Sequence, residues 1–154
     1  ELALSAVKTN RRIETISAMK TFFAESEAAI ASIPNLAGRF IPTGSTVLFP
    51  SYSGSLIKIL RRAGDGNSDL TYLFTESRPY RESRRVVAAL DALPVEFVGY
   101  SDAGVAIAAA RADLAIVGAD ALFTDGSFAN KTGTLPLALA CQYVAIAFFV
   151  VRVG

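Results

Sequence analysis

The chain has 154 residues, 52% of them hydrophobic, which predicts one domain with a substantial apolar core. Its 15 basic and 14 acidic side chains leave a net charge of +1, so neither nucleic acid nor an anionic membrane surface is expected to attract it directly. The absence of histidine excludes serine and cysteine triads and the commonest zinc ligand, and a single cysteine excludes an intramolecular disulfide.

Acid–base chemistry is therefore left to Asp, Glu, Lys, Tyr or the one cysteine. No cofactor or metal is expected, although carboxylates can hold a hard ion. The single cysteine favours a cytoplasmic chain, and the first residues lack the pattern of a signal peptide. The most apolar stretch, residues 135–151, contains Gln142 and is shorter than the roughly 20 residues of a membrane-spanning helix.

The first part of the chain is expected to be helical. Apolar residues recur near helical spacing over residues 3–33, and no proline or glycine interrupts them before Pro34. Residues 34–45 then hold two prolines and two glycines, which predict a connection. We expect a helical segment over residues 1–44, packed on a core or on a partner subunit, and a second domain over residues 45–154.

Beyond that connection, short apolar runs alternate with helical patterns. The runs predict strands at residues 46–49, 70–74, 95–100, 114–117 and 145–151, and the patterns between them predict helices at residues 55–62, 84–93, 103–112 and 134–143. Uniformly apolar strands that alternate with helices of about ten residues are typical of a parallel sheet covered on both faces. The predicted fold class is α/β, a Rossmann-like, doubly wound parallel sheet.

Ligands of such sheets bind beyond the carboxyl ends of the strands, and polar residues gather there in this sequence. The candidates are Ser51, Ser53, Gly54 and Ser55 after the first strand, Arg78 and Glu82 after the second, Asp102 after the third and Asp120 after the fourth.

Residues 117–136 connect the fourth strand to a helix and carry the richest set of polar groups. Asp120 stands at the strand end, where an acid can donate or accept a proton. Asn130 and Lys131 stand just before the helix, whose free N–H groups and nearby amine form an anion site. The combination predicts a small phosphorylated ligand that meets an acid.

Each loop also has a simpler interpretation. The serines of residues 51–55 suit a helix cap as well as a phosphate site, and Asp102 suits a cap of the next helix. The arginines after the second strand suit a solvated helix start, but cations there oppose the helix dipole, which favours a bound anion or an acidic partner. Asp120 lies between two alanines, which predicts a poorly solvated carboxylate and makes it the strongest functional candidate.

Several linked motifs also resemble one family. They are Thr-Glu-Ser-Arg-Pro at residues 75–79, Ser-Asp at 101–102, Val-Gly-Ala-Asp-Ala at 117–121 and Asp-Gly-Ser-Phe-Ala-Asn-Lys-Thr-Gly-Thr at 125–134. The order and spacing of these motifs, across about residues 45–151, are similar to those of one family of translation factor subunits and isomerases. The family comprises the alpha, beta and delta subunits of translation initiation factor 2B together with methylthioribose-1-phosphate and ribose-1,5-bisphosphate isomerases.

The resemblance implies a Rossmann-like domain preceded by a helical N-terminal domain, of which residues 1–44 would be a remnant, and a homodimer or larger assembly. It implies that Asp120 matches the acid that shuttles protons in the isomerases. It also implies that Asn130 and Lys131 match the pair that contacts their substrate. Glu82 matches a substrate-binding glutamine of the methylthioribose enzymes, and Ser51 matches their cysteine.

The substitution at Ser51 bears on catalysis. A serine hydroxyl has a far higher pKa than a thiol and, without histidine, is a poor acid–base partner for Asp120. The one cysteine, Cys141, lies in the last predicted helix and is expected in the core. The arginine-and-glycine segment that holds substrate phosphate in relatives has no match here, and Ser83 replaces a glycine.

Two functions remain open. The first is an initiation-factor-2B-related domain that binds a sugar phosphate or nucleotide without catalysis and assembles with itself or with translation-factor subunits; the loss of the cysteine favours it. The second is an aldose–ketose isomerase, an intramolecular oxidoreductase, that acts on a ribose 1-phosphate (methylthioribose 1-phosphate or ribose 1,5-bisphosphate) with Asp120 as proton shuttle and Ser51 in place of the thiol. The retention of Asp120, Asn130 and Lys131 favours it.

Overall fold

The computed structural model describes residues 39–151 and, before them, residues 16–17, 19–21, 24, 27–28 and 31–32. It separates into two units, with the boundary between residues 32 and 33. The described residues of the first unit are all helical, and the Thr21 hydroxyl donates to the Ser17 carbonyl one turn earlier, at 3.2 Å. The rest of the helix expected over residues 3–33 lies outside the described residues, and the division at residue 44 remains a prediction.

The second unit is built on a parallel sheet of five strands in the order β3-β2-β1-β4-β7. The strands are β1 (Thr46–Phe49), β2 (Thr71–Thr75), β3 (Glu96–Tyr100), β4 (Leu114–Gly118) and β7 (Ala147–Val151). In register, Val47 of β1 pairs with Tyr72 on one side and with Leu114 on the other. The predicted doubly wound α/β fold is confirmed.

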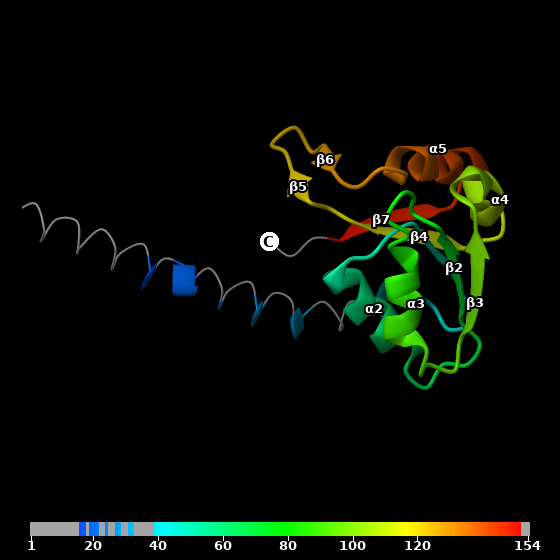
Figure 1. Ribbon diagram of the computed structural model, residues 1–154, viewed down its shortest axis with the longest axis horizontal. Coiled ribbons are helices and arrows are strands. Elements are labelled where there is room, and N and C mark those ends of the chain that lie inside the picture. The colour runs from blue at the N-terminus through cyan, green and yellow to red at the C-terminus, as the bar shows by residue number, and fades with distance from the viewer. Residues whose placement is uncertain are drawn as a thin grey trace, which may run out of the picture. The chain divides into compact units, whose positions relative to one another are not determined.

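Helices cover both faces of this sheet (Figure 1). Helices α2 (Gly54–Gly64) and α3 (Ser83–Leu90) lie on one face, and α4 (Val105–Ala109) and α5 (Thr134–Val144) lie on the other. A 3₁₀ turn, η1 (Asp102–Gly104), precedes α4. Because every strand runs in the same direction, the loops after β1, β2, β3 and β4 emerge at one edge, as expected.

The core lies at the centre of the sheet. Val47, Leu48 and Phe49 of β1 are fully buried, and β4 is buried at every position. The outer strands β3 and β7 are only partly buried, because each has a neighbour on one side alone. Apolar sequence therefore marks the strands correctly, but burial on both faces holds only for the central ones.

Among the residues that the structure describes, Tyr72 is the largest fully buried side chain, and its hydroxyl donates to the Leu60 carbonyl at 2.5 Å. Burial raises the pKa of this phenol. We expect Tyr72→Phe to lower the free energy of unfolding by about 1 kcal/mol, the net value of one hydrogen bond.

The same contact predicts a pH dependence. The folded-state pKa of Tyr72 is raised, so the stabilisation is complete below the unfolded phenol's pKa of about 10 and is lost as pH rises above it. Denaturant titration should show wild type losing more stability than Tyr72→Phe above that pH. Tyr143→Phe serves as the control, because Tyr143 is 90% exposed; an equal loss in all three proteins would contradict the prediction.

Candidate functional site

The loop after β1 leads from the buried Ser51 to the start of α2. Ser53 is the N-cap residue of this helix, with extended backbone angles, but no side-chain hydrogen bond caps α2 within the described chain. The first amide groups of a helix have no partner inside it. The serine side chains therefore do not cap α2 in the described structure, as the simpler interpretation would require. Ser53, Gly54 and Ser55 remain predicted ligand contacts.

The end of β4 lies directly against this loop. A Cβ at Gly118 would lie 3.2 Å from both Cβ and Oγ of Ser53, tighter than ordinary side-chain contacts, so glycine permits the close approach. The Asp120 N–H then donates to the Ala129 carbonyl at 2.8 Å. The contact with Ser53 brings the strand end that precedes Asp120 next to the start of α2.

A small hairpin that we did not predict follows Asp120. Its strands are β5 (Ala121–Leu122) and β6 (Phe128–Ala129), paired antiparallel. Asp125 accepts hydrogen bonds from the Ser127 hydroxyl at 2.6 Å and N–H at 2.9 Å, which lower the pKa of its carboxyl, and Gly126 has a φ of 84°. The Asp-Gly turn signal was present in the sequence, but strands of two residues carry no detectable periodicity.

The Asp120 side chain is exposed, which corrects the expectation of a poorly solvated carboxylate. Its alanine neighbours do not enclose it, because β4 ends at Gly118 and residue 120 already belongs to the connection to the hairpin. Its role as a proton shuttle remains a prediction.

Lys131 is the centre of the site. Its Nζ donates to Glu82 Oε2 at 2.6 Å and to the Tyr52 carbonyl at 2.9 Å. The Lys131 side chain is 35% exposed and the Glu82 side chain 20%. One ammonium group thus joins the loop after β1, the loop after β2 and the connection after β4, and the predicted convergence of these three loops is found.

Tyr52 and Ser83 support this cluster, although no pattern in the sequence placed either residue in it. The Arg85 guanidinium lies over the Tyr52 ring, 4.2 Å from its centroid. The buried Ser83 hydroxyl donates to the Thr75 carbonyl and lies 3.2 Å from the Pro50 carbonyl. Ser83 therefore ties the ends of β1 and β2 together.

Asn130 is held by the first turn of α5. Its amide donates to the Thr134 hydroxyl at 2.9 Å, and that hydroxyl donates to the Lys131 carbonyl at 2.8 Å. Gly133 has a φ of 99°, which permits the sharp entry into the helix. These bonds fix the backbone that presents Lys131.

Arg78 and Asp102 form a separate group. Asp102 does not cap the helix after it, because its two carboxylate oxygens accept the N–H groups of Ser77 and Arg78, each at 2.8 Å. The Arg78 Nε donates to Glu76 Oε2 at 2.9 Å. Within residues 39–151, no hydrogen bond or ion pair joins Arg78 or Asp102 to the Lys131 cluster, so their part in ligand binding remains a prediction.

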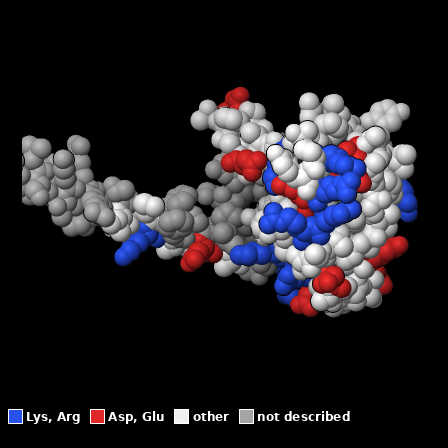
Figure 2. Space-filling model, in the orientation of Figure 1, with Lys and Arg blue, Asp and Glu red and all other residues white. Residues whose placement is uncertain are grey.

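Basic side chains gather on the face that carries α2 and α3 (Figure 2). The exposed members on these helices are Lys58, Arg61, Arg62, Arg84 and Arg85. The first turn of α3 contains no acid. The arginines predicted to oppose a helix dipole therefore do stand at the start of α3.

Cys141 lies in the core, as expected, and burial raises the pKa of its thiol. Among the described residues, no three Cys, Asp or Glu side chains come together as a metal site, and no helix is long and apolar enough to span a membrane. The apolar stretch of residues 135–151 forms α5 and β7.

Comparisons with known proteins agree with this architecture. The sequence profile of the Initiation factor 2 subunit family matches residues 2–152. A translation initiation factor eIF-2B subunit 2-like protein of Pyrococcus horikoshii is 33% identical over 142 residues, which cover 92% of this chain and 51% of that protein. A methylthioribose-1-phosphate isomerase of Alkalilimnicola ehrlichii is 33% identical over 127 residues, which cover 75% of this chain and 37% of that protein.

The fold is also that of a solved relative. The crystal structure of the translation initiation factor eIF-2B of Pyrococcus horikoshii superposes with a TM-score of 0.81 and 32% sequence identity, covering 87% of this chain and 49% of that one. The chain thus spans about half the length of these two eIF-2B relatives.

Proposed function

Because the chain belongs to the Initiation factor 2 subunit family, we propose that it binds a small phosphorylated ligand, a sugar phosphate or a nucleotide, in a regulatory role without catalysis. The observation that carries the proposal is the position of the Lys131 ammonium between Glu82 and the Tyr52 carbonyl, at the carboxyl ends of the strands. A cation held there, beside the start of α2, suits an anionic group.

The two charges of the cluster suggest how such a ligand is oriented. Lys131 and the free amide groups at the start of α2 favour the phosphate. The Glu82 carboxylate accepts hydrogen bonds but repels phosphate, so it suits the hydroxyl groups of a sugar. The exposed Asp120 carboxylate is a second acceptor at this edge.

We infer the lack of catalysis from the surroundings of Ser51. Its side chain is 4% exposed, and the chain has no histidine to activate its hydroxyl. Cys141 is buried in α5 and does not replace the missing thiol.

An aldose–ketose isomerase is the second candidate. Asp120, Asn130 and Lys131 all lie on one strand-to-helix connection, and one relative of 33% identity is named a methylthioribose-1-phosphate isomerase. In this reaction Asp120 would move a proton between neighbouring carbons of a ribose 1-phosphate held by Lys131, with Ser51 in the place of the thiol.

Assembly with a second copy or with translation-factor subunits in the cytoplasm is part of the proposal. It is supported by Leu135, Leu139 and Tyr143, which form a stripe along α5 and are 69%, 56% and 90% exposed. An apolar stripe of this kind is typical of a subunit contact.

Thermal denaturation with a ligand panel tests the binding function. The panel holds methylthioribose 1-phosphate, ribose 1,5-bisphosphate and purine nucleotides. At a concentration about 100-fold above its Kd, a bound ligand should raise the melting temperature by about 5 °C or more. Asp120→Asn should reduce the shift. No shift with any member of the panel, in the wild-type chain, would refute the proposal.

Ser51→Cys separates the two functions. If the site is otherwise that of an isomerase, the variant should convert one of the ribose 1-phosphates to its ketose, with wild type near background. We expect turnover in the variant at less than about one per second, because the thiol has no histidine partner. The assay measures ketose formation directly, and Ser68→Cys, which places a thiol at an exposed serine outside the site, is the control. Turnover by wild type at the rate of the variant would favour the isomerase and contradict the non-catalytic role.

A further inference from the structure

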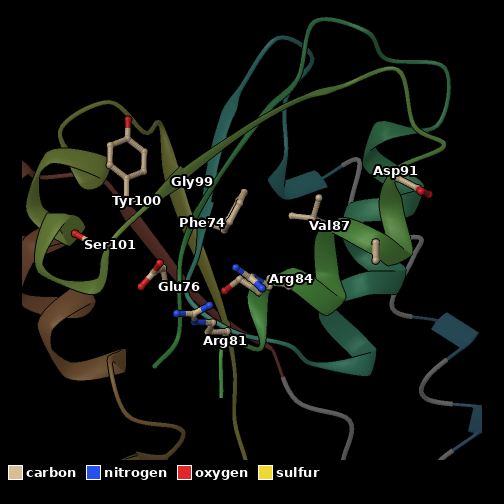
Figure 3. Close-up of a pocket in the computed structure, with 11 residues that line it drawn as sticks. Phe74, Glu76, Arg81, Arg84, Val87, Asp91, Gly99, Tyr100 and Ser101 are labelled. Carbon is tan, nitrogen blue, oxygen red and sulfur yellow. The ribbon is translucent and has the colours of Figure 1, made fainter. Parts of the chain in front are cut away.

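A cleft of about 590 Å³ lies between α3 and the edge strand β3 (Figure 3). Phe74 and Gly99 come from the sheet, and Val87 and Ala88 come from α3. Neither Lys131 nor Asp120 lines this cleft. Its volume lies within the range of small-molecule sites, so it is a second place for a ligand and does not depend on the function proposed above.

The inner surface of the cleft is apolar. A Cβ at Gly99 would lie 2.9 Å from Cζ of Phe74, so only glycine leaves that ring where it is. In Figure 3 the Phe74 and Val87 side chains face each other across the cleft. An aromatic ring and a residue without a side chain, opposite short aliphatic groups, suit a planar ring system.

One end of the cleft is basic. Arg81 and Arg84 line it, and their guanidinium groups make no hydrogen bond or ion pair within residues 39–151. Glu76 also lines this end, but its carboxylate is paired with Arg78 at 2.9 Å. Figure 3 shows the Arg81 and Arg84 side chains close together beside Glu76. This end therefore holds two unpaired guanidinium groups and one carboxylate that Arg78 neutralises, which favours the binding of an anion.

The other end of the cleft is acidic. Asp91 lines it and directly follows Leu90, the last residue of α3. It lies seven positions after Arg84, a rise of about 10 Å along a helix. A carboxylate at that distance attracts a hydrogen-bond donor and does not cancel the basic end.

We propose that this cleft binds a small planar aromatic anion, with its anionic group on Arg81 and Arg84, its ring on Phe74 and Gly99, and an amino group toward Asp91. The charges at the two ends fix the direction of the ligand, and the Phe74 ring beside Gly99 favours a flat body.

The probe is 6-aminonaphthalene-2-sulfonate, which carries an anion and an amine at opposite ends of a flat fluorescent body and contains no sugar. Fluorescence titration of the wild-type chain should give a Kd below about 1 mM. Ala88→Phe, which fills the cleft from an exposed position of α3, should weaken binding by about tenfold or more. Arg84→Ala should weaken it about fivefold, and naphthalene-2-sulfonate should bind wild type more weakly than the probe does.

Two variants serve as controls. Arg62→Ala removes an exposed arginine of α2 outside the cleft, and Lys131→Ala removes the cation of the other site; both should keep the wild-type Kd. Circular dichroism checks that Ala88→Phe is folded, and Arg84→Glu provides a second test that leaves the packing unchanged. The proposal is overturned by a Kd above about 1 mM, by equal Kd values in wild type and Arg84→Glu, or by loss of binding in Lys131→Ala.

Discussion

Lys131→Ala is expected to weaken the binding of the phosphorylated ligand about a hundredfold, equivalent to about 3 kcal/mol. The substitution removes the cation that faces the ligand and the bond to the Tyr52 carbonyl at 2.9 Å. It also leaves the Glu82 carboxylate, whose side chain is 20% exposed, without its partner at 2.6 Å. An unpaired carboxylate in that place repels phosphate, so the two losses act in the same direction. Isothermal titration with the ligand that stabilises wild type most measures the change.

Lys58→Ala is the matched control, because Lys58 is an exposed lysine of α2 away from the cluster. It should bind as wild type does, apart from a small change that salt removes. A change of less than about threefold in Lys131→Ala would mean that the ligand does not contact Lys131.

Glu82→Gln is expected to have the opposite effect and to tighten binding about tenfold. Glutamine keeps the shape of the side chain but removes the negative charge beside the Lys131 ammonium. Lys131 then no longer shares its charge with a carboxylate, and a phosphate group meets no repulsion. Titration of the variant with the same ligand measures the gain, which should shrink as salt concentration rises.

Glu96→Gln controls for the general effect of removing one acid, since Glu96 is exposed on β3.

The double variant of Glu82→Gln and Lys131→Ala adds a sharper test. Because the two side chains touch, their effects should not add, and the difference measures their coupling. Weaker binding in Glu82→Gln than in wild type would show that hydrogen bonds from the ligand to the charged carboxylate outweigh its repulsion of the phosphate, and would contradict this prediction.

Most of the fold could be predicted from periodicity. The strand at residues 46–49 was found at its observed limits, and the other strands and most helices lie within a few residues of the observed ones. The helix predicted over residues 103–112 is the exception. It divides into the turn η1 and a short α4, Val105–Ala109, with Gly104 at the boundary. An alanine-rich stretch has high helix propensity throughout, so propensity does not show where packing on the sheet ends the helix.

The convergence of the loops was predicted, but the pairings between their side chains were not. The rule for parallel sheets places the loops at one edge, and this was enough to predict that the loops carrying Ser53, Glu82 and Lys131 meet there. The bond between Glu82 and Lys131 spans 49 residues of sequence, and Asp102 reaches back 25 residues to Ser77. Such contacts depend on the exact course of two loops, which no local pattern records. The exposure of Asp120 was mispredicted for the same reason.

Amide chemical-shift mapping tests the ligand site most directly. Titration of the ¹⁵N-labelled chain with ribose 1,5-bisphosphate and with methylthioribose 1-phosphate shows which backbone groups meet the ligand. If the Lys131 cluster binds a sugar phosphate, the largest changes should fall on residues 51–55, Glu82, Asp120 and Lys131 with at least one of the two. Changes confined to the cleft at the opposite end of the strands, which Thr43 and Gly66 help to line, or no change with either compound, would contradict a phosphate site at Lys131.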